Sequence, residues 1–502
     1  MVMMKRLIAL GLSFCSLALC ACQFGKKEEV STEDTVKTEA STEAPEVMFK
    51  QINDDLPAKM DFGGELINIA VRGDARYNYE FIVDGGAANT GVVSQAIYKR
   101  NVAVEERLNV MVQYSPMGGG HGPFENIEAS ILGGIGAYDI AIGSNAPTNL
   151  FAVKGQYRNL RNIDNLNLSK GYWSQGMLEN STYADTTFFA TGAISTYFYD
   201  SAYVIYFNKQ LCTDWGIDPN TVYDIVLNGD WTLEQMISLT KDIYSDANQN
   251  GVVDDGDVYG FGLQVTSAVD GFSSSCGITM TEIVDNKVVY ALDVERNVNV
   301  VEKLADFVWN NEGVVALAES NYVKYDDVYL FEKQFVNDQL LFVTDWLYST
   351  SDSLRTMNSD FGVLPYPKYS ESEEYTTYVH DKFSVVGIPI SVEQGRVEML
   401  GAFLEAMASG GQNTVMPAYY ERALTGVYIR DVQSVQTMDI IVGNMKNDRI
   451  WFLDNTNCHK VIRAPIRDKA PNTVVSTYNI IYDLVNQNIN KIYDTYAKYS
   501  GN

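Results

Sequence analysis

The sequence has few of the residues and motifs on which enzyme active sites are commonly built. Only three of its 502 residues are histidines, His121, His380 and His459, and none stands at the HExxH spacing of a zinc protease. Neither a Walker A loop nor a GxSxG motif occurs, and "GGIGAY" (133–138) lacks the third glycine of a dinucleotide-binding fingerprint. The sequence therefore predicts a protein that is not an enzyme. Its 64 acidic residues still leave open a carboxylate pair of the glycoside hydrolase kind.

Positive charge and cysteine are scarce as well. Lys and Arg number 37 against 64 Asp and Glu, so the formal net charge is −27. Because affinity for nucleic acid rests on cationic neutralisation of phosphates, this balance excludes nucleic acid as a partner. The six cysteines form no metal or redox motif. We expect Cys212, Cys276 and Cys458 to be buried free thiols, with one disulfide among them as the alternative.

The N-terminus has the pattern of a bacterial lipoprotein signal. Lys5 and Arg6 precede a mostly apolar run, 7–19, that is too short to span a bilayer as a mature helix. The run ends in "LCAC", in which a large aliphatic residue stands three before Cys22 and a small one stands directly before it. We therefore predict a signal peptide over 1–21 and a Cys22 that carries lipid chains such as palmitate. A plain secretory signal is the alternative.

A segment without core-forming residues follows. Residues 26–46, "KKEEVSTEDTVKTEASTEAPE", contain many Ser, Thr and Glu and almost no large apolar side chains. Such a segment cannot bury enough surface to offset its ordering entropy, so we predict a disordered tether over 22–59. The folded body then begins near residue 60. Its roughly 440 residues exceed one ordinary hydrophobic core, so at least two lobes are expected.

The body opens with alternating strand and helix patterns. Three apolar runs are predicted to be strands: "ELINIAVRG" (65–73), "NVMVQY" (109–114) and "AYDIAIGSN" (137–145). The helix between the first two is expected to turn Arg100 and Arg107 outward. This order predicts a parallel sheet covered by helices, in which ligands bind at the carboxyl ends of the strands. The segments 73–76 and 143–145 are therefore the first places to expect a site.

The stretch "DANQNGVVDDGD" (246–257) matches the pattern of a calcium loop. The EF-hand pattern places oxygen ligands at alternate positions, a glycine at the sharp turn and a carboxylate at the end. The predicted calcium ligands are Asp246, Asn248, Asn250, the Val252 carbonyl, Asp254 and Asp257. Here the last ligand is Asp rather than Glu, whose longer side chain reaches further. An acidic surface turn held by its own hydrogen bonds is the alternative.

Aromatic residues are abundant, with 32 Tyr, 21 Phe and 6 Trp. Aromatic rings stack on the apolar C–H faces of sugars, and polar side chains replace the water that sugar hydroxyls lose. Most of these rings are expected in the core. The strongest candidates for stacking are Trp346 in "VTDWLYS" and Tyr199 in "YFYDSAY", with Trp173 and Trp451 as weaker ones.

Several segments in one order resemble a known family. The chain resembles an extracellular solute-binding lipoprotein of a bacterial carbohydrate-type ABC transporter over nearly all of its body. The segments that carry the resemblance are "AIYKRNVAVEERLNVMV" (96–112), "YDIAIGSN" (138–145), "SAYVIYFNKQLCTDWGID" (201–218), "WTLEQMISLTKDI" (231–243), "FVNDQLLFVTDW" (335–346), "DFGVLPYPKY" (360–369), "FSVVGIPIS" (383–391) and "PAYYERAL" (417–424). No single segment is specific, but their order and spacing are.

The resemblance implies an α/β fold of two interwoven lobes, like that of periplasmic binding proteins, with a hinge of crossing strands. The first lobe is expected over 60–202 and 390–420, and the second over 203–389 and 421–502. Ligand is expected to bind between them and to shift the protein toward a closed state. The closed protein, a monomer held by its lipid on the outer face of the cytoplasmic membrane, would then deliver a sugar or oligosaccharide to the subunits of an ABC permease.

The resemblance and the strand ends together imply ligand contacts from each lobe. The first lobe and the crossover are expected to supply Asp74, Arg76, Ser144, Asn145, Tyr199 and Asp200. The second lobe is expected to supply Asp345, Trp346, Tyr378 and His380. The lone calcium loop resembles a structural clamp of this family rather than a sensor. The alternatives are a binding protein for a peptide or polyamine, and a surface glycoside hydrolase.

Overall fold

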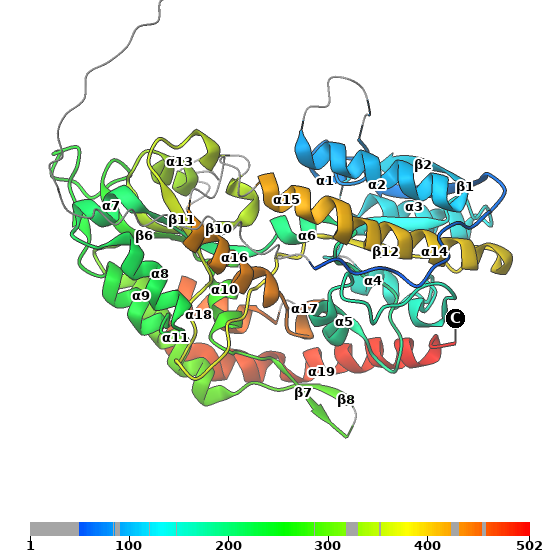
Figure 1. Ribbon diagram of the computed structural model, residues 1–502. Helices are drawn as coiled ribbons and strands as arrows, with labels where there is room; N and C mark the ends of the chain where they lie inside the picture. Colours follow the sequence, from blue (N-terminus) through cyan, green and yellow to red (C-terminus); the bar gives the residue numbers. More distant parts are fainter. Residues whose placement is uncertain are drawn as a thin grey trace, which may run out of the picture. The chain divides into compact units, whose positions relative to one another are not determined.

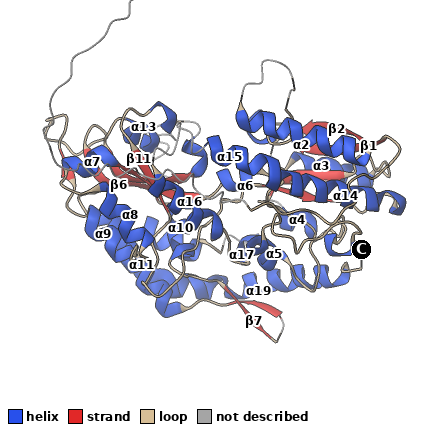
Figure 2. Ribbon diagram, viewed as in Figure 1, coloured by secondary structure: helices blue, strands red, loops and turns tan. Residues whose placement is uncertain are grey.

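The computed structural model describes residues 50–501, apart from 84, 86–90, 120, 147, 286, 318–329, 351–352, 423–430 and 454–457. The predicted signal peptide, Cys22 and most of the predicted tether lie outside these residues. The prediction that the tether is disordered up to residue 59 is wrong for its end, because Ile52 and Asp54 are bonded to the first lobe. The described residues belong to one compact unit. The strands of this unit gather in two main sheets, each with its own helices (Figure 1, Figure 2). In the part of the chain described here, no helix is long and apolar enough to cross a membrane.

The first sheet has four strands in the order β12-β3-β1-β2. Their bounds are β1 Glu65–Arg72, β2 Val110–Met117, β3 Ile140–Ser144 and β12 Ser384–Gly387. Strand β1 pairs in parallel with β2 and β3, which confirms the predicted parallel arrangement, and β12 runs antiparallel to β3. The predicted lobe boundary at residue 390 placed 384–387 in the second lobe. In the structure the chain returns to the first sheet before this segment, because Ser384 already pairs with Ser144.

Helices cover the first sheet. Their bounds are α1 Ala75–Asn78, α2 Val92–Leu108, α3 Gly122–Leu132, α4 Thr148–Ala152, α5 Gln175–Ser181 and α14 Gln394–Gly410, which continues into a π-helical turn, Gly411–Val415. Helix α3 packs on β1 and β3, and α2 packs on β2 and α14. Helix α2 ends at Asn109, whose φ of 49° is the left-handed conformation common after a last helical turn.

The prediction that Arg100 faces outward is wrong. Arg100 is 2% exposed, and its guanidinium donates to the main-chain oxygens of Glu80 (2.8 Å) and Ile194 (3.1 Å). Its position three residues after Ile97 places it on the apolar face of α2. The two carbonyls compensate for the loss of water around the charge. Arg107 is half-buried and pairs with Asp54 in the segment that precedes the first strand.

The second sheet has the order β11-β4-β10-β6-β5, and β9 also pairs with β6. The bounds are β4 Tyr203–Asn208, β5 Tyr244–Ser245, β6 Val258–Gln264, β9 Val314–Leu317, β10 Leu340–Trp346 and β11 Phe361–Leu364. Strand β4 is antiparallel to β10 and β11, whereas β10 and β6 are parallel. Strand β4 lies in the segment 201–218, β10 in 335–346 and β11 in 360–369, whereas β5, β6 and β9 were not predicted.

The helices of the second lobe are α7 Lys209–Asp214, α8 Pro219–Leu227, α9 Leu233–Thr240, α10 Ser267–Ser275, α11 Val294–Trp309, α13 Leu330–Val336 and α16 Val432–Gly443. A hairpin of β7 Thr281–Val284 and β8 Lys287–Tyr290 stands apart from both sheets. Short 3-10 turns occupy Leu160–Asn162, Leu347–Thr350 (η2), Leu354–Thr356 and Pro471–Thr473. Among the described residues, Cys212, Cys276 and Cys458 are buried thiols that form no disulfide, as predicted.

The chain passes between the sheets several times. Helix α6 Thr196–Asp200 leads into β4, and the segment before β12 leads back, with a bridge between Ala202 and Val379 where the two passages meet. Helix α15 Met416–Arg422 forms part of a third passage. These crossings confirm the predicted two-lobe α/β fold with interwoven lobes.

The last helix, α19 Val474–Lys498, touches both lobes. Its first half packs on β8, on α11 and on α18 Lys460–Arg467, and its later part reaches α4 and α17 Ile450–Leu453. The ring of Tyr496, near its end, lies 4.5 Å from that of Phe188 in the first lobe. Figure 1 shows this helix as a long red ribbon that runs along both groups of elements. The chain end therefore does not belong to the second lobe alone.

Candidate functional site

The candidate site lies where the crossing segments meet the end of β10. Trp346 is the last residue of β10 and is half-buried. Its ring centroid lies 4.3 Å from that of His380, on the return crossing, and 6.0 Å from that of Tyr203, at the start of β4. Tyr203 and His380 are themselves nearly parallel, with centroids 6.0 Å apart. The structure thus brings together two of the predicted residues, and adds Tyr203.

His380 is held at both ends. Its main-chain N–H donates to the Ser201 carbonyl (2.9 Å), and its Nδ1 lies 3.0 Å from the Asp381 carboxylate. Burial acts to raise the pKa of Asp381, but the hydrogen bond and the charge of His380 outweigh it, so this pKa is lowered. An ionised Asp381 beside the imidazole fixes the ring near Trp346.

Tyr378 packs against Tyr203 of this aromatic group. It is 3% exposed, and its ring lies 5.6 Å from Tyr203 and 5.2 Å from Trp451. Burial raises the pKa of its hydroxyl well above the usual value. Trp451 is half-buried and stacks on His459 with centroids 5.7 Å apart. The predicted ligand contact of Tyr378 is therefore replaced, in this geometry, by packing against two other rings.

A buried ion pair adjoins the same rings. Asp270 on α10 is 3% exposed and receives two hydrogen bonds from the guanidinium of Arg463 on α18, one of them 2.7 Å long. Burial raises the pKa of Asp270, and the charge of Arg463 opposes this. Both charges act on Tyr378. The sequence gives no sign of this pair, because 193 residues separate its members.

Asp345 is engaged with its own strand end. Its Oδ1 accepts from the Trp346 main-chain N–H (2.7 Å), and its Oδ2 accepts from Ser349 Oγ (2.7 Å). Burial raises the pKa of Asp345, while these bonds, Glu332 and the charge of Arg76 act against the shift. Asp345 thus fixes the main chain at Trp346 rather than presenting free oxygens.

Asp200, expected to reach ligand from the crossover, is held by two tyrosines. It is 1% exposed, and its carboxylate accepts from Tyr79 (2.5 Å) and from Tyr419 on α15 (2.6 Å). Tyr199 is buried, with its ring 6.3 Å from that of Tyr419. Burial raises the pKa of Tyr199. Asp200, on the first crossing, thus bonds Tyr79 of the first lobe and Tyr419 of the third crossing at once.

The first-lobe candidates have different surroundings. Asp74 caps α1 by accepting from the Arg76 main-chain N–H (2.8 Å). The Arg76 guanidinium lies 4.7 Å from the ring of Tyr348, which follows β10 in the second lobe. Ser144 Oγ donates to the Asp381 carbonyl (3.2 Å) and so holds the return crossing. Asp74 is exposed, two residues before the Arg76 that contacts Tyr348 of the second lobe.

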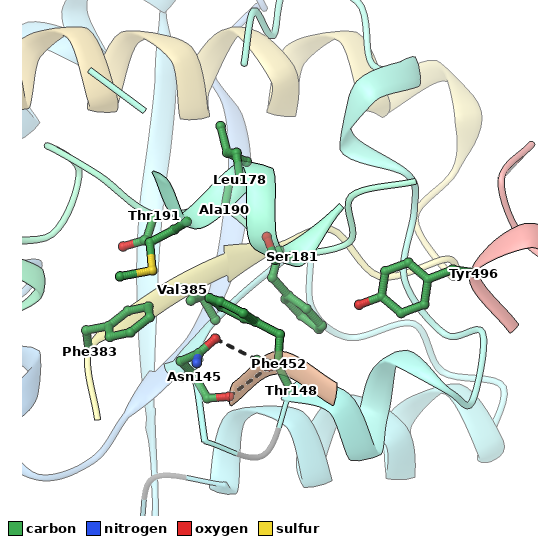
Figure 3. A pocket seen from close by; sticks show the side chains of 12 residues that line it. Asn145, Thr148, Leu178, Ser181, Ala190, Thr191, Phe383, Val385, Phe452 and Tyr496 are labelled. Atoms are coloured by element: carbon green, nitrogen blue, oxygen red, sulfur yellow. Dashed lines mark hydrogen bonds between the residues drawn. The ribbon is translucent and has the colours of Figure 1, made fainter. Parts of the chain in front are cut away.

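Asn145 faces a small cavity inside the first lobe. Figure 3 shows Asn145 with Thr148, Phe383, Phe452 and Tyr496 around this space. The cavity measures about 20 Å³, which is enough for one water molecule and too small for a sugar ring. The Asn145 Nδ2 finds no hydrogen-bond partner among the described residues. This geometry separates Asn145 from the cluster around Trp346.

Of the weaker aromatic candidates, Trp173 belongs to the core. It is 1% exposed, and its Nε1 donates to the Glu405 carboxylate (3.1 Å). Tyr172 donates to the same carboxylate. Burial raises the pKa of Glu405, and these hydrogen bonds oppose the shift. The polar sequence around Trp173 reflects this buried acceptor rather than a ligand site.

Loop 246–257 closes as an EF-hand-like turn. Gly251 has a φ of 72°, the left-handed conformation that the sharp turn requires, and its N–H donates to Asp246 Oδ2 (2.9 Å). The Asn250 amide donates to Asp254 Oδ2 (2.6 Å). The loop side chains therefore bond to one another and to loop amides, which is the arrangement of the alternative, an acidic turn held by its own hydrogen bonds.

Asp257, the last position of the pattern, is the buried end of the loop. Its Oδ2 accepts from the Tyr244 hydroxyl (2.9 Å), whereas its Oδ1 has no hydrogen-bond partner among the described residues. A cation would satisfy this oxygen, so the residues present fit calcium. No group of three His, Cys, Asp or Glu side chains converges as a metal site within the described ranges. The calcium pattern also uses Asn and main-chain oxygens, such as that of Val252, and calcium stays a prediction.

The fold has counterparts among solved structures. No family model matches the chain, and no curated protein matches it in sequence. UgpB from Mycobacterium tuberculosis in complex with glycerophosphocholine is 12% identical, with a TM-score of 0.54, over 85% of this chain and 99% of that one. The GacH receptor of Streptomyces glaucescens, also described with acarbose, is 12% identical, with a TM-score of 0.52, over 84% and 99%.

A third counterpart is the ABC substrate-binding protein Lmo0181 from Listeria monocytogenes in complex with cycloalternan. It is 14% identical, with a TM-score of 0.51, over 85% of this chain and 98% of its own. At such identities the likeness establishes the fold. The chain has the two-lobe fold of ABC-transporter solute-binding proteins.

Proposed function

We propose that the protein is the substrate-binding component of an ABC importer, which captures a sugar or oligosaccharide between its lobes and delivers it to a membrane permease. The observation that carries the proposal is the half-exposed ring of Trp346, set among Tyr203 and His380 where the crossing segments join the lobes. An indole in this place offers an apolar face to a ligand that both lobes enclose.

The chemistry around Trp346 suits a neutral polyhydroxylated ligand. The His380 ring, the Asp381 carboxylate and the Lys382 ammonium, which lies 5.5 Å from the indole, are hydrogen-bonding groups beside an apolar surface. Sugars present this combination of apolar C–H faces and hydroxyl groups. Acarbose and cycloalternan in two of the counterparts are of this class. Glycerophosphocholine in the third shows that the fold also accepts other cargo.

The proposal includes an extracytoplasmic place for the protein, with Cys22 as its lipid anchor. The tether then joins the first lobe. Arg107 on α2 forms two hydrogen bonds with the Asp54 carboxylate (2.7 and 2.9 Å), and Ile52 donates to Asn413 Oδ1 (2.9 Å). An anchor fixed to one lobe leaves the other lobe free to move on ligand binding. Metabolic labelling with a palmitate analogue, compared between the wild type and Cys22→Ser, tests the anchor.

We further propose that loop 246–257 binds one structural calcium ion. Asp246, Asn248, Asn250, Asp254 and Asp257 would hold it, together with the Val252 carbonyl. The ion would replace the amide donors that now fill the loop and would satisfy Asp257 Oδ1. Calcium supplies charge for stability here and takes no part in holding the sugar.

A thermal-shift screen of the mature body against an oligosaccharide panel, with calcium or with EDTA, tests both proposals. A ligand at 100 times its Kd stabilises the native state by about 2.7 kcal/mol. For a body of this size that corresponds to a Tm rise of about 3 °C. A rise with one glycan class supports sugar binding, and recovery of that glycan intact excludes hydrolysis. A rise with peptides or polyamines alone would contradict the cargo assignment. Loss of basal Tm in EDTA with an unchanged glycan shift supports a structural calcium ion.

A further inference from the structure

Arg72, the last residue of β1, holds the return crossing through two hydrogen bonds. It is 2% exposed, and its Nη1 donates to the Lys382 carbonyl (2.7 Å) while its Nη2 donates to Ser384 Oγ (2.7 Å). The rings of Tyr77 and Tyr197 lie 4.4 and 5.4 Å from its guanidinium carbon. A planar cation between two rings has little freedom to change its position.

The main chain of the return crossing is held on two sides. The carbonyls of Asp381 and Phe383 accept main-chain hydrogen bonds from the loop after β3 (2.9 and 3.0 Å). Lys382 lies between them in a turn, and its carbonyl is bonded by another group. Arg72 is the group that meets it there. The guanidinium thus adds a side-chain contact to a segment that is also bonded by the loop after β3, by Ser201 and by Thr191.

This segment brings the polar groups to Trp346. His380 lies 4.3 Å from the indole centroid, and the Lys382 ammonium lies 5.5 Å from it. The carbonyl that Arg72 holds belongs to Lys382 itself and lies two residues after His380. A shift of the Lys382 main chain would therefore move both groups relative to the indole.

We propose that Arg72 is a positioning residue, which from the first lobe sets the place of His380 and Lys382 against Trp346 and thereby the affinity for sugar. The proposal rests on the proposed function of Trp346 as the sugar platform. Arg72 touches no ligand in this account. It acts through the main chain of the return crossing.

The buried charge of Arg72 has a counterpart in Glu80, which is fully buried. Glu80 Oε2 accepts from Ser195 Oγ (2.6 Å) and from the Tyr197 main-chain N–H (2.9 Å). Removing the charge of Arg72 would leave this carboxylate without its cation and would destabilise the fold. The informative substitution is therefore Arg72→Lys, because it keeps the charge but cannot form both hydrogen bonds in the same geometry.

The test compares Arg72→Lys with Arg100→Lys. Arg100 is equally buried in the same lobe, but its guanidinium donates to the main-chain oxygens of Glu80 and Ile194 and not to the return crossing. Two quantities are measured: amide hydrogen exchange of the peptide 379–385 in the free protein, and the Kd for the glycan found with the wild type. We expect faster exchange and a Kd about tenfold weaker, equivalent to about 1.4 kcal/mol, for Arg72→Lys. We expect neither change for Arg100→Lys, even if the two substitutions lower the Tm by the same amount.

Equal exchange in Arg72→Lys and the wild type, or equal effects of the two variants, would overturn the proposal. If Arg72→Lys does not fold, Ser384→Ala removes the Nη2 partner, together with a hydrogen bond between Ser384 and the Glu80 carboxylate, and is expected to change exchange and Kd in the same direction by less. If no glycan binds the wild type, the proposed function fails, and the exchange measurement alone still decides whether Arg72 holds the crossing.

Discussion

Replacing Tyr496 by alanine tests whether α19 is seated on the first lobe. Tyr496 is 6% exposed, its ring lies 4.5 Å from Phe188 and 5.2 Å from Tyr183, and Thr186 Oγ1 donates to its carbonyl (3.1 Å). Removal of a buried aromatic ring costs about 3–5 kcal/mol. The ring also borders the cavity of about 20 Å³ beside Asn145 (Figure 3). The neighbouring side chains leave this cavity unfilled, so we expect them not to fill the larger one that Tyr496→Ala would create.

We therefore expect Tyr496→Ala to lower the free energy of unfolding by about 4 kcal/mol. With an unfolding entropy near 1 kcal/mol/K for a body of this size, Tm should fall by about 4 °C. Urea denaturation and thermal unfolding of the mature body measure both quantities. Ile480→Ala, on the same helix but 80% exposed, serves as the control and should change stability by less than about 0.5 kcal/mol. Equal stabilities of Tyr496→Ala and the control would refute the seating of this helix.

Three further predictions concern charged groups. Asp54→Asn should cost about 1 kcal/mol at pH 7 by weakening the bonds to Arg107. Burial acts to raise the pKa of Asp54, but Arg107 lowers it below 3.8. In urea denaturation, the difference in unfolding free energy between the wild type and Asp54→Asn should therefore disappear only as pH falls through this lowered pKa. Asp200→Asn should cost about 1.5–3 kcal/mol in the same assay, because two tyrosine hydroxyls lose a charged acceptor and Asn offers them one neutral oxygen, whereas Tyr419→Phe should cost less. Asp257→Asn should abolish a calcium-induced rise in Tm and leave a glycan-induced rise unchanged; loss of both would contradict the separation of the two sites.

Strands β1, β2 and β3 could be predicted from sequence because each comes from a short apolar run that ends in polar residues or glycine. The run that became β1 was predicted over 65–73 and spans Glu65–Arg72. The run predicted over 137–145 likewise contains β3, which spans Ile140–Ser144. Local patterns of this kind depend on neighbours along the chain, which a single sequence contains.

The surroundings of charged side chains could not be predicted in the same way. Arg100 was predicted to face outward and Asp200 to contact ligand, yet both are buried because distant carbonyls or hydroxyls meet them. Arg72 did carry a sign, as an arginine at the end of an apolar strand, but its partners lie more than 300 residues away. Hydrogen bonds between remote segments decide which polar residues support a site and which line it.

The lobe boundary shows the same limit. An apolar run such as 384–387 is equally suitable for either sheet, and only pairing with β3 assigns it to the first. Likewise, nothing in the composition of α19 reveals that Tyr496 packs on Phe188. Element type follows from local pattern, whereas the partner of each element follows from the complete core.

The most direct test of the central claim is an equilibrium titration of the mature body with the glycan that gives the largest thermal shift. The titration is performed on the wild type, on Trp346→Ala, and on Trp215→Ala, which removes a 38% exposed indole at the end of α7 and away from the crossings. The account predicts a Kd at least about tenfold weaker for Trp346→Ala, equivalent to about 1.4 kcal/mol, and an unchanged Kd for Trp215→Ala. Saturable binding with the same Kd in all three proteins would contradict the assignment of Trp346 as the sugar platform, and absence of binding to the wild type would contradict sugar binding itself.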